Sequence, residues 1–442
     1  MPNIKLNLKE TDGIIKHVNA VNNGPAGSKV RNFSSFPLYE ALEIPYARNH
    51  DAAFFNGYGG EHTVDVHRIF KNFDADVEDP NAYVFSPTDR YIADTESVGT
   101  KTFYRLGAAI EHGYKFGTYP PKDYLKWAKI CEHIIMHYTE GWANGFNYDI
   151  EYWEIWNEPD CLNHDGTSPT WQGTYEEFNK FYCTVGLYLK ERFPHLKFGG
   201  PAFTSSWKTD FKMSFLKSVK ESGAPLDFYS FHGYIQTPEQ IIELSDAAVE
   251  CLFEAGFSKD TELIFNEWNY IRGWLGDEYM YSMKAINGLK GASFDIGVMC
   301  AGQASDMDML MYYEGRPCMF CGLFDSYYEP QKPYYAFLMF KDVKNLGKWV
   351  KSDYGKDGIY YCAATNNKES AIILTNYSDV DDTPAKEVTL KIENINNCKK
   401  IEYYLLDETH DNELVKTEEI TSTTAEIKLN IDLFSTFLIK IV

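Results

Sequence analysis

The sequence has no long apolar run. No stretch approaches the roughly 18 consecutive apolar residues of a membrane-spanning helix, and the longest candidates, such as residues 296–301, are far shorter. The first residues, MPNIKLNLKETDG, alternate polar and apolar side chains and lack the apolar core of a secretory signal. We therefore expect a soluble, cytoplasmic protein.

Positive charge is also scarce. The chain has 42 Lys and Arg against 64 Asp and Glu, a formal net charge of −22 that is spread along its length. Such a field repels phosphate backbones and anionic lipids. We expect no nucleic-acid or membrane partner, and a neutral substrate fits this charge better.

A disulfide framework is missing as well. The nine cysteines are odd in number and irregularly spaced in a long chain, which favours reduced thiols. Cys318 and Cys321 form the one closely spaced pair, without a second such pair or a nearby histidine. Structural zinc sites normally need four ligands, so we predict neither a metal nor a cofactor.

What is present is a globular composition, 44% hydrophobic over 442 residues, with short apolar strands alternating with amphipathic helices. A glycine-rich GxGxxG turn, typical of the open doubly wound sheet, is absent. Eight βα units can instead close into a (β/α)8 TIM barrel. The expected strands are residues 15–21, 63–70, 100–107, 151–157, 196–201, 226–232, 262–268 and 295–303. The clearest helical patterns cover residues 121–142, 175–193, 211–222, 238–255 and 278–289.

The sequence pattern changes after residues 330–346, which we predict to form the last helix of the barrel. Residues 349–442 consist of strand-sized runs separated by polar turns, which predicts an antiparallel β-sandwich. We expect a catalytic barrel at residues 1–347 and an accessory domain at 348–442. The first fourteen or so residues could pair with the C-terminal sheet.

Two glutamates end opposed strands of the expected barrel. Glu158 follows strand four before a proline, and Glu267 lies at the end of strand seven. The active rim of a TIM barrel is formed by the carboxyl ends of its strands, so these carboxylates can approach to about 5 Å, the separation in a retaining glycosidase. One would protonate the leaving oxygen and the other would attack the sugar.

The two carboxylates need different surroundings. The acid needs a raised pKa, and a neighbouring negative charge provides it until that neighbour becomes an ester. The nucleophile must stay ionised, and we expect Tyr234 on strand six and Arg68 on strand two to hold it so. Glu154 lies one repeat deeper, and we predict that it forms an ion pair with Arg68 or Arg105.

These residues resemble a known family. The run Tyr-Trp-Glu-Ile-Trp-Asn-Glu-Pro at 152–159, Glu-Trp-Asn at 267–269 and His-Gly-Tyr at 232–234 are similar to clan A glycoside hydrolases, closest to glycoside hydrolase family 39, which includes β-xylosidases and α-L-iduronidases. The resemblance implies that Glu158 is the acid/base and Glu267 the nucleophile. It also implies that Asn157 binds the sugar 2-hydroxyl and that His232 and Tyr234 line the site.

Three positions depart from the family pattern. Residues 302–306 read Gly-Gln-Ala-Ser-Asp where a Trp-Thr-Phe-Ser-Asp run is common after strand eight, so Trp268, Trp274 or Tyr312 could replace the aromatic floor. The Arg-x-His of strand two is read as adjacent His67 and Arg68, and His67 suits pocket and packing equally. Arg105 ends strand three, where it could bind a sugar carboxylate or pair with Glu154.

The sequence predicts a retaining exo-glycosidase, with β-xylosidase as the leading activity on short oligosaccharides or glycosides. An arabinosidase, a β-glucosidase, a β-galactosidase or a uronate-directed enzyme needs only changes in the pocket. A catalytically silent carbohydrate-binding barrel and a structural protein are the rivals from other classes. A small carbohydrate is the expected ligand, and the loops at 161–174 and 306–330 could also pack in a homo-oligomer.

Overall fold

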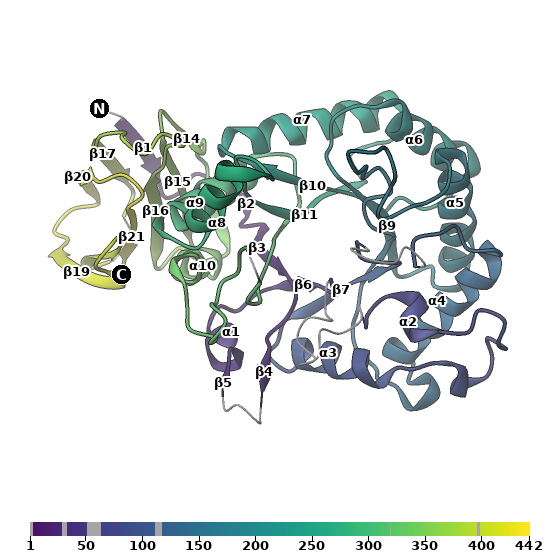
Figure 1. Cartoon of the computed structure of the whole chain (residues 1–442). Coiled ribbons are helices and arrows are strands. Elements are labelled where there is room, and N and C mark those ends of the chain that lie inside the picture. The colour runs from purple at the N-terminus through teal and green to yellow at the C-terminus, as the bar shows by residue number, and fades with distance from the viewer. Residues whose placement is uncertain (1–2, 29–32, 51–62, 111–116, 319, 396–397) are drawn as a thin grey trace.

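The computed structural model describes residues 3–28, 33–50, 63–110, 117–318, 320–395 and 398–442. Its centre is a closed barrel of eight strands in the order β10-β11-β12-β3-β6-β7-β8-β9, all paired in parallel. Helices surround the barrel, and a β-domain packs on one side of it (Figure 1). The predicted fold class is therefore confirmed. The barrel strands are β3 (His17–Asn22), β6 (Tyr46–Arg48), β7 (Lys101–Leu106), β8 (Tyr152–Ile155), β9 (Lys197–Phe203), β10 (Phe228–Ile235), β11 (Glu262–Tyr270) and β12 (Met309–Tyr312).

Amphipathic sequences form the outer helices. The clearest start belongs to α5, where Thr174 and Glu177 make a reciprocal capping box that satisfies two backbone N–H groups at the helix N-terminus. The α-helices of the described residues are α1 (Phe36–Ala41), α2 (Val66–Ile69), α3 (Ser86–Glu96), α4 (Tyr124–Thr139), α5 (Tyr175–Arg192), α6 (Asp210–Ser222), α7 (Glu239–Glu254), α8 (Gly276–Ile286), α9 (Leu289–Ala304) and α10 (Lys332–Lys344).

Two of the eight predicted strands are wrong. The second barrel strand is the three-residue β6, and residues 63–70 contain helix α2 instead. The eighth strand is β12, whereas residues 295–303 lie inside helix α9. This helix is buried over almost its whole length, between barrel strands and the β-domain sheet. Its apolar residues therefore surround the helix instead of following one face, and this removes the helical pattern.

The C-terminal part is a β-sandwich with its own core. One sheet runs β19-β18-β21-β16-β15-β13-β2, with β14 paired to β15, and the other runs β1-β17-β20. The pairings of the larger sheet are antiparallel. In the smaller sheet β17 and β20 are antiparallel, whereas β1 joins β17 in parallel. The strands are β1 (Asn3–Asn7), β2 (Thr11–Ile14), β13 (Lys348–Val350), β14 (Gly355–Lys356), β15 (Ile359–Thr365), β16 (Ser370–Asn376), β17 (Lys386–Glu393), β18 (Lys400–Leu406), β19 (Asp411–Glu419), β20 (Thr424–Ile431) and β21 (Thr436–Ile441).

The N-terminal strands belong to both sheets of this sandwich. Ile4, Leu6 and Leu8 are buried in its core, and Ile14 pairs with Lys348. We therefore propose a division in which residues 348–442, together with the first fourteen or so, form the β-domain. A short hairpin of β4 (Gly27–Ser28) and β5 (Phe33–Ser34) leaves the barrel near α1.

Candidate active site

The two predicted glutamates meet at the carboxyl end of the barrel. One carboxylate oxygen of Glu158 and one of Glu267 lie within 4.8 Å of each other and of a ring nitrogen of His232. Glu158 is 8% exposed and Glu267 is 7% exposed, so both are largely removed from water while remaining reachable. The side chains of strands β10 and β11 and the turn after β8 thus converge on one small region.

Local backbone geometry turns Glu158 toward the barrel axis. Trp156 and Glu158 both have a positive φ, 81° and 47°, a conformation that side-chain-bearing residues rarely adopt. The Glu158 N–H donates to the carbonyl of Ala202 at 2.9 Å, and the hydroxyl of Thr170 donates to the Glu158 carbonyl. The turn is held from both sides, and the glutamate is fixed.

A β-bulge directs Glu267 inward. The pairing of β10 with β11 shifts register after Phe265, so the chain places an extra residue, Asn266, in this strand. As a result, Asn266 donates to Glu154 inside the barrel while the next residue, Glu267, also contacts interior groups. Bulges commonly re-aim side chains beside functional sites.

Three side chains face the carboxylate of Glu267, and two of them, Tyr234 and Arg48, favour its ionised form. The hydroxyl of Tyr234 donates to Oε1 at 2.6 Å, and Nη1 of Arg48 and Nε2 of His50 lie 3.5 and 3.6 Å from Oε2. Burial nevertheless raises the pKa of Glu267, the neighbouring Glu158 raises it further, and Arg48 and Tyr234 oppose this rise. The charge on Glu158 therefore disfavours the ionised form of Glu267.

His232 bridges the two glutamates. Its Nδ1 lies 2.7 Å from Oε1 of Glu158 and 3.6 Å from Oε2 of Glu267. Burial lowers the pKa of His232 to about 4, so the imidazole is neutral near pH 7. A neutral ring can exchange a hydrogen bond with Glu158 without adding a charge to the site.

Arg48 organises the floor beneath the pair. Its guanidinium donates to Glu154 at 2.7 Å, to Asn157 at 2.6 Å and to Asn22 at 3.2 Å. Ser230 and Asn266 donate to the other oxygen of Glu154. The predicted ion pair of Glu154 with Arg68 or Arg105 is therefore wrong, because Arg48 forms it.

Asn157, next to Glu158 in the chain, keeps one amide donor unpartnered within the described structure. Its Oδ1 is taken by Arg48, and its buried Nδ2 has no hydrogen-bond partner among the described residues. A buried donor left in this way is costly unless a ligand satisfies it. Arg48 thus holds the Asn157 side chain through Oδ1, and Nδ2 remains available as a hydrogen-bond donor to a ligand.

Several predicted substrate contacts lie elsewhere. Trp268 is fully buried and packs edge-to-face on Tyr312, toward α9, because it follows the inward-facing Glu267 on the same strand. Arg105 is fully buried and paired with Asp65 at 2.6 Å, so its charge is already balanced. Neither residue joins the group around the glutamates.

His67 and Arg68 are not on a barrel strand. Both lie on helix α2. The ring of His67 packs so closely on Gly117 that a Cβ added to Gly117 would lie 2.2 Å from Cε1 of His67. The Arg-x-His pattern is instead carried by Arg48, Asn49 and His50 at the end of β6. Strand β6 has only three residues. The signal that could have revealed it is the Arg-x-His pattern directly after Tyr46 and Ala47.

The end of strand eight also needs correction. It is β12, followed by Tyr313, whose ring stacks on Phe320 at 5.9 Å and lies 6.0 Å from the ring of His50. Tyr312 is buried against Trp268 and Phe337. Tyr313 therefore supplies an aromatic ring at this side of the site, whereas Tyr312 and Trp268 do not.

The grouped oxygens and nitrogen of Glu158, His232 and Glu267 are also potential metal ligands. Arg48 and the Tyr234 hydroxyl already face the oxygens of Glu267, and a fixed guanidinium opposes a second cation there. The Sγ atoms of Cys318 and Cys321 lie 3.5 Å apart, but within the described part of the chain they belong to no larger cluster of possible ligands. None of the nine cysteines, all of which are described, forms a disulfide.

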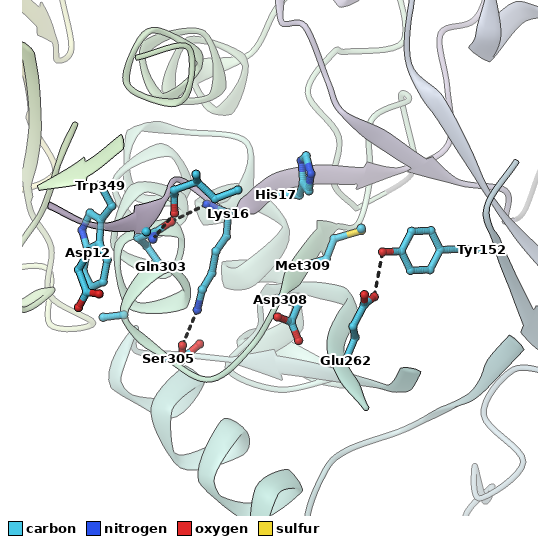
Figure 2. Close-up of a pocket in the computed structure, with 13 residues that line it drawn as sticks. Asp12, Lys16, His17, Tyr152, Glu262, Gln303, Ser305, Asp308, Met309 and Trp349 are labelled. Carbon is cyan, nitrogen blue, oxygen red and sulfur yellow. Dashed lines mark hydrogen bonds between the residues drawn. The ribbon is translucent and has the colours of Figure 1, made fainter. Parts of the chain in front are cut away.

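A cavity of about 500 Å³ lies at the opposite end of the barrel (Figure 2). There Nζ of Lys16 donates to the carbonyl of Ser305 at 2.6 Å, and the hydroxyl of Tyr152 donates to Glu262 at 2.8 Å. The amino ends of the strands, such as Met309, line this cavity. In TIM barrels that end serves stability, and the active face is the other one.

Among the described helices, none is long and apolar enough to cross a membrane.

Parts of this sequence are similar to known proteins. A model of the glycosyl hydrolases family 39 matches residues 60–252. A β-xylosidase of Geobacillus stearothermophilus is 29% identical over 181 residues, 38% of this chain and 33% of that protein. A β-xylosidase of Caldicellulosiruptor saccharolyticus is 30% identical over 139 residues, 31% of this chain and 24% of that protein. The chain thus matches about a third or less of the length of these relatives.

Solved structures match over the whole chain. A glucosidase from Croceicoccus marinus superimposes with a TM-score of 0.81 at 18% identity, covering 100% of this chain and 99% of the other. A monomeric β-xylosidase from Caulobacter crescentus gives 0.71 at 15% identity, with the same coverage. These likenesses establish the fold. The segment 60–252, which includes Asn157, Glu158 and His232 but ends before Glu267, is the part of the chain that is similar to the glycosyl hydrolases family 39.

Proposed function

We propose that this protein is a retaining, exo-acting glycoside hydrolase, most specifically a β-xylosidase acting on short oligosaccharides or glycosides. The observation that carries the proposal is that one carboxylate oxygen of Glu158 and one of Glu267 lie within 4.8 Å of each other. Retaining enzymes hold the two carboxyl groups about 5 to 5.5 Å apart, whereas inverting enzymes need about 6.5 to 9.5 Å for a water molecule.

Glu267 is the proposed nucleophile. Tyr234 and Arg48 stabilise its negative charge, and both contacts remain available while it forms an ester with the anomeric carbon. Glu158 is the proposed acid/base, since it shares its hydrogen bond with the neutral His232 instead of a cation. Once Glu267 is esterified, its charge is lost, and Glu158 can then deprotonate the attacking water.

Asn157 is proposed to donate from Nδ2 to the sugar hydroxyl beside the reacting carbon. Xylose is the preferred sugar because the two partial sequence relatives are β-xylosidases. The fold match to a glucosidase makes β-glucosidase the second candidate. A uronate-directed activity is less suited, because Asp65 already neutralises Arg105. We also propose a cytoplasmic location, which suits nine unbridged cysteines.

A panel of p-nitrophenyl glycosides tests this proposal. We expect turnover of the β-xyloside, loss of turnover in Glu267→Ala, and a loss in Glu158→Ala that is much larger for alkyl than for aryl leaving groups, because only the former need protonation. Glu262→Gln, at the opposite end of β11, is the matched control and should retain turnover. Binding of sugars without cleavage of any glycoside would instead indicate a silent carbohydrate-binding barrel.

A further inference from the structure

One tryptophan stands exposed at the edge of the candidate active site. Trp274 follows β11 in the loop before α8, and 52% of it is accessible to solvent. Its ring packs edge-to-face on Tyr234, with centroids 4.7 Å apart and planes at 75°. The same Tyr234 donates to Glu267, so Trp274 is only one ring away from the proposed nucleophile.

The ring is held in place by other aromatic side chains. Phe320 lies 6.0 Å from it at 71°, and Tyr279 lies 6.3 Å from it at 29°. Because neighbouring rings already fix this half-exposed indole, a ligand that stacks on its face would cost little side-chain conformational entropy. Other tryptophans do not share this position: Trp171 is 2% exposed and packs on Trp156.

We propose that Trp274 is a stacking platform for the leaving-group part of the substrate, a second sugar ring or an aryl ring, and so sets the preference for that part. This inference rests on the proposed function. The sugar that is cleaved must reach Glu158, Glu267 and Asn157, which are 8% exposed or less. The half-exposed ring of Trp274 at the rim would therefore contact the leaving-group part of the substrate, which projects outward from the buried sugar.

The test compares substrates that differ only in the leaving group: xylobiose and p-nitrophenyl β-xyloside carry a ring, and methyl β-xyloside carries none. In Trp274→Ala we expect KM for the two ring-bearing substrates to rise about 3- to 10-fold, as the loss of one aromatic contact predicts. For methyl β-xyloside kcat/KM should stay within about 2-fold by the same reasoning. Trp274→Phe keeps a ring and should restore most of the loss.

Trp207→Ala is the matched control. Trp207 is 50% exposed, but its neighbour Lys208 pairs with Glu254 at the last residue of α7, in the outer helical layer. This variant should leave all three substrates unchanged. A Trp274→Ala variant that loses methyl β-xyloside and xylobiose turnover equally, or neither, would overturn the inference.

A binding measurement separates this inference from the proposed function. Quenching of tryptophan fluorescence should show weaker binding of xylobiose to Trp274→Ala than to the unmodified protein, with xylose binding unchanged. If the protein cleaves no glycoside, the hydrolase proposal fails while this binding difference still supports the platform. Equal binding of xylobiose to both proteins would overturn the platform whatever the activity.

Discussion

Arg48 is the residue on which most of the site depends. It is fully buried and contacts Glu154, Asn157, Asn22 and Glu267. Arg48→Met leaves Glu154 buried without its cation, and we expect a loss of about 3 to 5 kcal/mol in the free energy of unfolding, measured by urea denaturation. Lys101→Met removes an exposed pair with Asp149 and should cost about 1 kcal/mol or less. Equal losses in the two variants would argue against this role for Arg48.

Tyr234 is one of the groups that affect the protonation of Glu267. Its hydrogen bond favours the carboxylate and so opposes the burial that raises the pKa of Glu267. Tyr234→Phe removes that opposition, the pKa rises further, and the acid limb of the kcat/KM against pH profile should move up by about one pH unit. An acid limb that stays in place or moves to lower pH would contradict this assignment.

At the scale of elements, the close approach of β7 to the turn after β8 fixes Glu158. Gly107 has φ 140°, and a Cβ there would lie 2.9 Å from Cα of Trp156. Gly107→Ala should therefore cost about 3 kcal/mol of stability and lower kcat. Gly99 also has a positive φ, 76°, but open space around it, so Gly99→Ala should cost about 1 kcal/mol and leave kcat unchanged. Similar kcat values for the two variants would count against the packing argument.

Element lengths explain what the sequence could and could not reveal. Strands such as β8 and β11 are apolar runs ending in recognisable motifs, so Glu158, Glu267, Asn157, His232 and Tyr234 were identified from sequence and are found together. Strand β6 has three residues, too few for a periodic signal, and Arg48 and His50 were therefore missed. Trp268 was assigned to the site as a replacement for the aromatic floor, but it directly follows the inward-facing Glu267, and strand alternation therefore turns it toward the helices.

At the scale of the whole molecule, the N-terminus stabilises the C-terminal domain. Strand β1 pairs with β17 and buries Leu6, 1% exposed, while the adjacent Lys5 is exposed. Leu6→Ala should lower the free energy of unfolding by about 2 to 5 kcal/mol, and Lys5→Ala by about 0.5 kcal/mol or less. Below the melting temperature kcat/KM should stay unchanged in both, since β1 lies outside the barrel. Destabilisation by Lys5→Ala as large as that by Leu6→Ala would contradict this picture.

Two glutamates from different barrel strands are proposed to act on one sugar by double displacement. Proton NMR of the anomeric signal during the first minutes of β-xyloside cleavage tests it most directly. The short separation of the carboxylates predicts that β-xylose appears first and then mutarotates. Initial formation of α-xylose would show inversion and would contradict the account.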